Sequence, residues 1–232
     1  MKVDLMREFT FEAAHFNESA PAAATNARLH GHSYRVVTRI TGAVDGRLGW
    51  VTDFAEIKRH CKPVIEQLDH RLLNEIDGMT DTSRGDVERW IAEKLAYAQS
   101  GFAGCEVTIL GDLSLAPVVR AEGTIERVVF GFPAAHFLPM LPPEHKCRRM
   151  HGHSFQIEVA GPNSAALLGT IESVYPRLDH RVLNEVDGLM NPTSENLARW
   201  LWQSVTCAGC PIGEVVVKET CTTCCRYQGE GD

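Results

Sequence analysis

The chain contains 232 residues, 44% of them hydrophobic and 23% charged, with a formal net charge of −7 and a pI near 5.8. This is an ordinary composition for a folded protein, and the acidic balance without a Lys/Arg block argues against nucleic acid or an anionic membrane as a partner. The first residues lack the apolar core of a signal peptide and no apolar run reaches membrane-spanning length, so we expect a cytoplasmic protein whose eight cysteines are reduced.

Strands and helices are expected in the same order in both halves of the chain. In the first half, one strand runs into His15, a second starts at His30, a helical middle covers residues 53–68, and the short strands CEVTIL and SLAPVVR close the unit. In the second half, one strand ends at His136 and another begins at His151, before the helical SENLARWLWQSV and the strand GEVVVKET. This order predicts an α+β fold with antiparallel sheets, used twice.

Three segments show that the chain is an internal repeat. FEAAHF recurs as FPAAHF, LHGHSY as MHGHSF, and LDHRLLNEIDG as LDHRVLNEVDG. The offset between copies falls from 121 (His15 to His136) to 110 (His70 to His180), so the second copy has lost a net 11 residues. We expect a short connection there in place of residues 45–62, without the helix start that an Asp53–Glu56 capping box predicts. The units are placed at 1–122 and 123–232, packed without a linker.

Three histidines of each half predict a metal site. His151 and His153 are two apart at a strand start and so project to one face, and His136 ends the preceding strand. Three imidazoles with one open position are typical of a catalytic zinc site. The alternative, a chance HGH turn, is disfavoured because the spacing recurs exactly in the first half, as His15, His30 and His32.

Cys147 is the candidate general base, because a thiol beside a dication and next to Arg148 and Arg149 is expected to have a lowered pKa. An inert buried cysteine is the alternative. The matching residue of the first half is Asn26, which cannot do this chemistry.

Two carboxylate motifs complete the candidate set. Asp179-His180, repeated as Asp69-His70, forms either a proton relay or a helix-orienting pair. Glu219, at the end of a strand, is either an acceptor for an amidine-like ring edge or a solvated charge, and its first-half counterpart is expected at or near Gly111.

Two C-x-x-C pairs raise the alternative of a zinc ribbon. They are Cys207 with Cys210, and Cys221 with Cys224. Their gap of 10 residues is shorter than the usual ~15–20, which disfavours this second site.

The motifs AAH, C-x-x-x-HGH, LDH, PTSEN and KETCTTCCRY together resemble the 6-pyruvoyl- and 6-carboxy-tetrahydropterin synthase family over essentially the whole chain, as two copies. HKCRRMHGHSF with KETCTTCCRY looks most like the 6-carboxy branch of queuosine and 7-deazapurine biosynthesis. The resemblance implies tunnelling-fold (ββααββ) units that form an oligomeric barrel with helices outside, and 7,8-dihydroneopterin triphosphate as substrate.

The resemblance also implies roles for the candidate residues of the second half. Zn²⁺ on the three histidines would polarise the side-chain hydroxyls of the substrate, and the thiol would abstract a proton with the Asp-His pair as relay, contributed across a subunit interface. Glu219 would anchor the pterin, helped by Thr193 and Ser194. The first half lacks the thiol and the glutamate, and DTSRGD replaces its PTSEN-like segment, so we expect it to bind zinc and to be inactive alone.

The expected assembly is a homo-oligomer, either a trimer of chains with the two kinds of half in separate rings or a dimer with alternating halves in a four-unit ring. We favour alternation, because Asp69-His70 would then complete the site of Cys147. Other possible functions are 6-pyruvoyl-tetrahydropterin formation, cleavage of a dihydropterin side chain, and a pterin-binding pseudoenzyme or scaffold.

Overall fold

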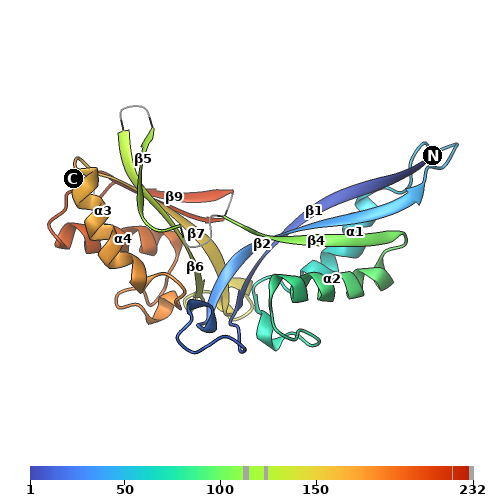
Figure 1. Ribbon diagram of the computed structural model, residues 1–232, viewed down its shortest axis with the longest axis horizontal. Coiled ribbons are helices and arrows are strands. Elements are labelled where there is room, and N and C mark those ends of the chain that lie inside the picture. The colour runs from blue at the N-terminus through green and yellow to red at the C-terminus, as the bar shows by residue number, and fades with distance from the viewer. Residues whose placement is uncertain (112–114, 123–124, 221, 230–232) are drawn as a thin grey trace.

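The computed structural model describes residues 1–111, 115–122, 125–220 and 222–229 (Figure 1). The two halves of the sequence form two α+β units side by side along the long axis of the molecule, with the N-terminus at one end and the C-terminus at the other. Each unit is a mainly antiparallel sheet with two helices on one face, as the repeat predicts.

The sheet of the first unit is built on a long hairpin. Strands β1 (Lys2–His15) and β2 (His30–Ala43) pair without interruption from Lys2↔Ala43 to His15↔His30. Strand β4 (Phe102–Leu110) adds to β2, and the two-residue β3 (Arg71–Leu72) lies parallel to the end of β1, giving the order β3-β1-β2-β4.

Helices α1 (Phe54–Ile65) and α2 (Arg84–Ala98) cover one face of this sheet. Their apolar residues at helical spacing are fully buried against alternate residues of β2. The side chain of Asp53 caps α1 by accepting from the N–H of Ala55, whereas Glu56 pairs with Arg59 and forms no capping box among the described contacts.

The second unit repeats this plan with one more strand. Its sheet has the order β5-β6-β7-β8-β9, and its core joins α3 and α4 to the inner face of β6, β7 and β8. The elements are β5 (Val118–Glu122), β6 (Ile125–His136), β7 (His151–Ala160), α3 (Ser164–Val174), α4 (Ser194–Cys207), β8 (Glu214–Thr220) and β9 (Thr223–Tyr227). Short 3-10 turns lie at Thr25–Ala27, Leu73–Glu75, Lys146–Arg148, Tyr175–Arg177 and Leu183–Glu185.

Two sequence expectations about the middle of the chain were wrong. The second unit keeps its first helix, because α3 begins at Ser164, 110 residues after Phe54, with Asn163 as N-cap. The deletion instead shortens β7 relative to β2 and removes most of the following loop. The described part of the SLAPVVR segment, residues 115–120, does not close the first sheet, since Val118–Glu122 pairs antiparallel with β6 in the second; Ser114 lies outside the described residues.

The two units meet where β2 crosses β7, at the glycines of the two HGH motifs. A Cβ on Gly31 would lie 2.4 Å from the Cα of Gly152, so no larger residue fits at this crossing. Beside it, Ser33 and Ser154 exchange backbone-to-hydroxyl hydrogen bonds of 3.3 and 3.4 Å. These reciprocal contacts give the chain an approximate internal two-fold symmetry.

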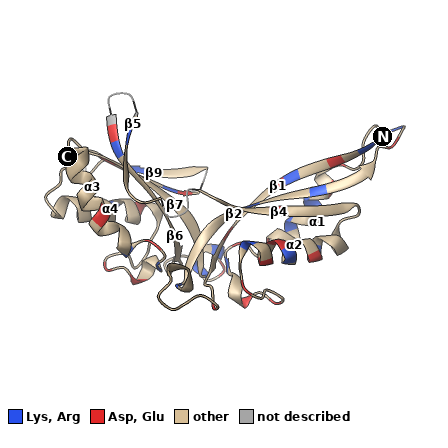
Figure 2. Cartoon of the chain, in the orientation of Figure 1, with Lys and Arg blue, Asp and Glu red and all other residues tan. Residues whose placement is uncertain are grey.

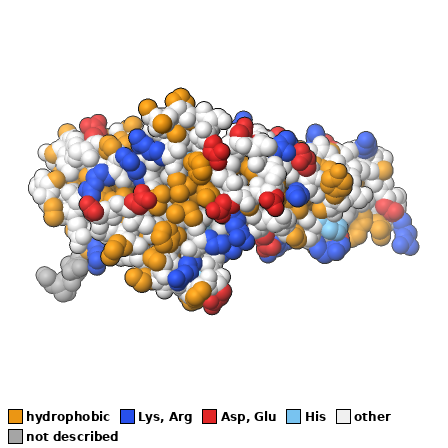
Figure 3. All heavy atoms as spheres, turned by 90° about the horizontal axis from the view of Figure 1, so that it is seen from below, with side chains coloured by type: hydrophobic (Ala, Val, Ile, Leu, Met, Phe, Trp, Pro, Cys, Tyr) orange, Lys and Arg blue, Asp and Glu red, His pale blue; other side chains and the backbone are white. Residues whose placement is uncertain are grey.

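Charge is spread over both units. Figure 2 shows Lys and Arg interspersed with Asp and Glu along strands and helices, with no face of one sign in this view. Seen from below, hydrophobic side chains gather left of the middle of the molecule (Figure 3). Among the described residues, no helix is long and apolar enough to span a membrane.

Candidate active site

Three buried imidazoles of the second unit converge as the sequence predicts. His136 ends β6, His151 and His153 begin β7, and the register pairs His136 with His151 directly. The Nε2 atoms of His136 and His151 are 3.1 Å apart, and ligand atoms of all three histidines lie within 4.8 Å of one another. All three residues are at most 2% exposed.

Each of these rings is fixed from behind through Nδ1. His136 donates to the carbonyl of Pro192 at 2.9 Å, and His151 donates to the carbonyl of Arg149 at 2.8 Å. His153 donates to the carboxylate of Glu12, from the first unit, at 2.8 Å. An acceptor on Nδ1 leaves Nε2 as the coordinating atom, which is the usual arrangement around a metal-binding histidine.

The protonation of the cluster is set by burial and by two carboxylates. Burial, with the charge of His153, lowers the pKa of His136 to about 4, and burial also lowers the pKa of His151. Burial would lower the pKa of His153 too, but its hydrogen bonds to Glu12 and Glu219 raise that pKa to about 9. Neutral imidazoles with convergent Nε2 atoms fit Zn²⁺, which must displace one proton from His153.

Cys147 lies beside this cluster, close to the Asp69-His70 pair of the other unit. His70, Cys147 and His151 have ligand atoms within 4.8 Å of one another, and the rings of His70 and His151 stack at 4.4 Å. Asp69 accepts from Nδ1 of His70 at 2.8 Å and from Nζ of Lys146 at 2.9 Å. The thiol of the second unit is therefore paired with Asp69-His70 within a single chain.

Without the dication that the sequence expectation assumed, the pKa of Cys147 is raised. Burial raises it most and Glu219 and Asp69 add to the rise, whereas Lys146 and Arg149 lower it as expected of neighbouring cations. Arg148 turns away, donating to the carbonyls of Pro139 and Leu141. Arg149 donates instead to the carbonyl of His70.

Glu219 lies among the metal-binding candidates. Its Oε1 is 3.1 Å from Nε2 of His153, and its Oε2 accepts from the hydroxyl of Ser194. Burial opposes ionisation, but His153, His136 and Ser194 overcome it and lower the pKa of Glu219 to about 2. The hydroxyl of Thr193 is used as the N-cap of α4, where it accepts from the N–H of Asn196.

The first unit holds a second, poorer cluster. His15, His30 and His32 also have ligand atoms within 4.8 Å of one another, and burial lowers the pKa of His15 to about 3 and that of His30 to about 4. The register aligns Glu219 with Ile109, two residues before the expected Gly111, so this cluster has no carboxylate at that position.

The Asp179-His180 pair of the second unit lies beside this first cluster. The rings of His180 and His30 lie 4.6 Å apart, and His180 donates to Asp179 at 2.9 Å. His70 and His180 both adopt left-handed backbone conformations, with φ of 56° and 52°. Such strained non-glycine residues are typical of functional sites.

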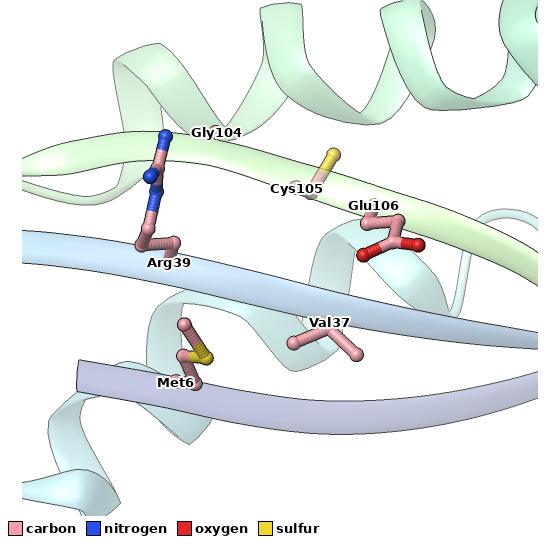
Figure 4. A pocket seen from close by; sticks show the side chains of 6 residues that line it. All are labelled: Met6, Val37, Arg39, Gly104, Cys105 and Glu106. Atoms are coloured by element: carbon pink, nitrogen blue, oxygen red, sulfur yellow. The ribbon is translucent and has the colours of Figure 1, made fainter. Parts of the chain in front are cut away.

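Neither the cysteine pairs nor the sheet surface adds another site. Cys207, Cys210 and Cys224 join no ligand cluster among the described residues, and Cys221 lies outside them. A hollow on the open face of the first sheet, between Met6, Arg39 and Glu106 (Figure 4), contains none of the candidate residues.

Sequence reasoning missed Glu12, whose side chain contacts the second-unit cluster. Its only signal in the sequence is that the two copies differ at this position: Glu12 in FEAAH corresponds to Pro133 in FPAAH. Contacts between residues 141 positions apart leave no local pattern in one sequence.

Comparison with known proteins identifies the family of the chain. The model of the 6-pyruvoyl tetrahydropterin synthase family matches residues 4–110 and again 124–230. The chain belongs to this family. It carries two copies of the family's tunnelling-fold unit.

Three relatives illustrate the match to a single copy, each covering less than half of the chain. A 6-carboxy-5,6,7,8-tetrahydropterin synthase of Synechocystis sp. is 37% identical over 115 residues, covering 42% of this chain and 88% of the relative. A dihydroneopterin monophosphate aldolase of Pyrococcus furiosus is 30% identical over 95 residues, covering 41% and 76%. The solved 6-pyruvoyl tetrahydropterin synthase of Caenorhabditis elegans is 23% identical and covers 48% and 97%, with a TM-score of 0.42.

Proposed function

We propose that the chain is a zinc-dependent lyase that converts 7,8-dihydroneopterin triphosphate to 6-carboxy-5,6,7,8-tetrahydropterin, the step that serves queuosine and 7-deazapurine biosynthesis. The observation that carries this proposal is the convergence of three buried imidazoles with the thiol of Cys147 and the Asp69-His70 pair. The similarity to the Synechocystis 6-carboxy-tetrahydropterin synthase favours this branch of the family.

His136, His151 and His153 would hold the zinc, which acts as a Lewis acid on the hydroxyls of the substrate side chain when bound. The protein supplies the ring orientation, because every Nδ1 is already engaged. It also excludes water, since these three residues are at most 2% exposed.

Cys147 would remove the proton from the substrate side chain, and His70 would first accept the proton of the thiol. Asp69 fixes the tautomer of His70 with hydrogen on Nδ1, so Nε2 is an acceptor. Because burial raises the pKa of Cys147, the thiol needs such an acceptor to react at neutral pH.

Glu219 would bind the N–H groups of the pyrimidine edge, because it is ionised at neutral pH and Ser194 holds one of its oxygens. The triphosphate would meet Arg149, whose pKa is lowered by burial and by the neighbouring guanidinium of Arg71. A guanidinium near the thiol, with a second one beside it, suits an anionic leaving group.

We also propose that the chain assembles as a homo-oligomer. Strand β3 covers only Ala13 and Ala14 of β1, so among the described residues most of β1 and all of the outer side of β4 are open edges. Open edges favour pairing with another copy. The two sheets of one chain cross at Gly31 and Gly152 and do not continue into one another. This favours three chains, with the two kinds of half in separate stacked rings, over a ring in which the halves alternate. A mass of two chains in light scattering would reverse this preference.

The direct test is product identification. Purified zinc-loaded protein is incubated with 7,8-dihydroneopterin triphosphate and the products are identified by mass spectrometry, with Cys147→Ala as control. The proposal expects 6-carboxy-5,6,7,8-tetrahydropterin and acetaldehyde from the wild type only.

A side-chain cleavage activity is the second candidate, favoured by the similarity to the Pyrococcus aldolase. A hydroxymethyl-dihydropterin product would support it and refute the first proposal. Binding of the pterin without turnover would instead indicate a pseudoenzyme.

A further inference from the structure

We propose that Glu12 of the first unit is a positioning residue for His153 of the second unit. The first cluster lacks the equivalent carboxylate contact because Pro133 occupies the symmetry-related position. The two metal sites of one chain would then differ in affinity, with the second-unit site the tighter. This inference rests on the proposed metal sites and goes beyond the reaction assigned to them.

The side chain of Glu12 lies at the junction between the units and contacts residues of both. One oxygen accepts from Nδ1 of His153 at 2.8 Å and from the hydroxyl of Ser33 at 2.6 Å. The Glu12 side chain is only 13% exposed, and that of His153 only 3%. Ser33, which pairs with Glu12 across the β1–β2 ladder, therefore aims the carboxylate across the junction at a histidine of the other unit.

The repeat defines the equivalent position exactly. Glu12 pairs with Ser33 in the first sheet, and Pro133 pairs with Ser154 in the second, each 121 residues later. By the internal symmetry, position 133 is the one from which a side chain would reach His32. Proline offers no acceptor there, and Nδ1 of His32 is buried without a hydrogen-bond partner among the described residues.

The backbone of Glu12 adds a second link that proline cannot reproduce. The N–H of Glu12 donates to Oδ1 of Asp69 at 3.1 Å, and its carbonyl accepts from the N–H of His70 at 2.6 Å. Glu12 thus connects the relay pair and the metal ligand. Pro133 keeps only the carbonyl contact, to the N–H of His180 at 2.9 Å, because it has no N–H to donate.

A carboxylate on the far nitrogen of a metal-bound histidine fixes the tautomer, holds the ring plane and increases the basicity of the ligating nitrogen. Loss of such a partner costs about 10–100-fold in metal affinity. His32 has the opposite situation, since an unpartnered Nδ1 leaves both its tautomer and its orientation unspecified.

The test measures zinc and cobalt binding by each site separately in the full chain. The first site is removed with His15→Ala/His30→Ala and the second with His136→Ala/His151→Ala. Zinc affinity is then measured by chelator competition, and the Co²⁺ d–d spectrum reports the geometry of the remaining site. Glu12→Gln is combined with the variant that lacks the first site, and Pro133→Glu with the variant that lacks the second site. Glu8→Gln, which removes a carboxylate of the same strand that pairs with Arg35, is the matched control.

We expect Glu12→Gln to weaken zinc binding at the second-unit site by at least roughly tenfold and to change its Co²⁺ spectrum, with no effect of Glu8→Gln. Pro133→Glu should tighten the first-unit site, and Pro133→Ala, which adds an N–H without a carboxylate, should not. A smaller loss in Glu12→Gln, or an equal gain in Pro133→Ala, would overturn the proposal. If neither single-site variant binds zinc when Glu12 and Pro133 are unchanged, the proposed metal sites themselves are wrong.

Discussion

Replacement of Asp69 by asparagine tests whether the relay of the second-unit site comes from the first unit. The carboxylate of Asp69 accepts from Nδ1 of His70, from Nζ of Lys146 and from the N–H of Glu12. Asparagine presents an NH₂ in place of one oxygen, which favours the tautomer of His70 with hydrogen on Nε2. His70 then cannot accept the proton of Cys147.

The expected cost is catalytic. Loss of a positioned general base lowers kcat by about 10²–10⁴-fold. The fold is affected little, because Lys146 is 53% exposed and a pair of this kind contributes about 0–1 kcal/mol. KM should change little, since no pterin contact is assigned to Asp69.

The assay is steady-state turnover of 7,8-dihydroneopterin triphosphate, with thermal unfolding as the check on folding. Asp179→Asn is the matched control, because Asp179-His180 lies at the first-unit cluster, which has no thiol. The account expects a large fall for Asp69→Asn and near wild-type kcat for Asp179→Asn. The reverse pattern would show that another subunit supplies the relay.

Further predictions concern packing, pH and substrate binding. Gly31→Ala should lower Tm in a thermal melt, because its Cβ would clash with Gly152 and overpacking costs about 1–3 kcal/mol; an unchanged Tm would contradict the crossing of the sheets. In chelator-treated protein, the free energy of unfolding should fall as pH drops from 6.5 to 5, since the pKa values of His15 and His30 are lowered to about 3 and about 4 and the unfolded state binds more protons. The expected slope in urea unfolding is about 1.4 kcal/mol per pH unit for each imidazole, and a flat profile would refute burial as neutral rings. Cys147→Ala should lose turnover yet retain pterin binding in calorimetry, whereas Glu219→Gln should weaken that binding; equal binding in both would remove Glu219 from the substrate site.

The repeat and its metal-binding histidines could be read from the sequence because they depend on local patterns. His151 and His153 alternate along one strand, and hairpin pairing brings His136 beside them. The histidine spacing is identical in both copies, which made the cluster predictable without coordinates.

The relation between the units could not be predicted in the same way. Which Asp-His pair faces Cys147 depends on the crossing of two sheets at Gly31 and Gly152, and no spacing within one unit encodes it. The pKa of Cys147 likewise depends on burial, which outweighs the neighbouring cations named by the sequence. The contact of Glu12 with His153 has the same long-range origin.

The position of the metal relative to both units is the most direct test of this account. Anomalous diffraction at the zinc edge, from crystals of the full chain, locates each ion and the residues around it. The account predicts a peak bounded by His136, His151 and His153, with Cys147 and His70 of the same chain beside it. A peak only at the C-terminal cysteines, or a second-unit cluster faced by Asp179-His180, would contradict it.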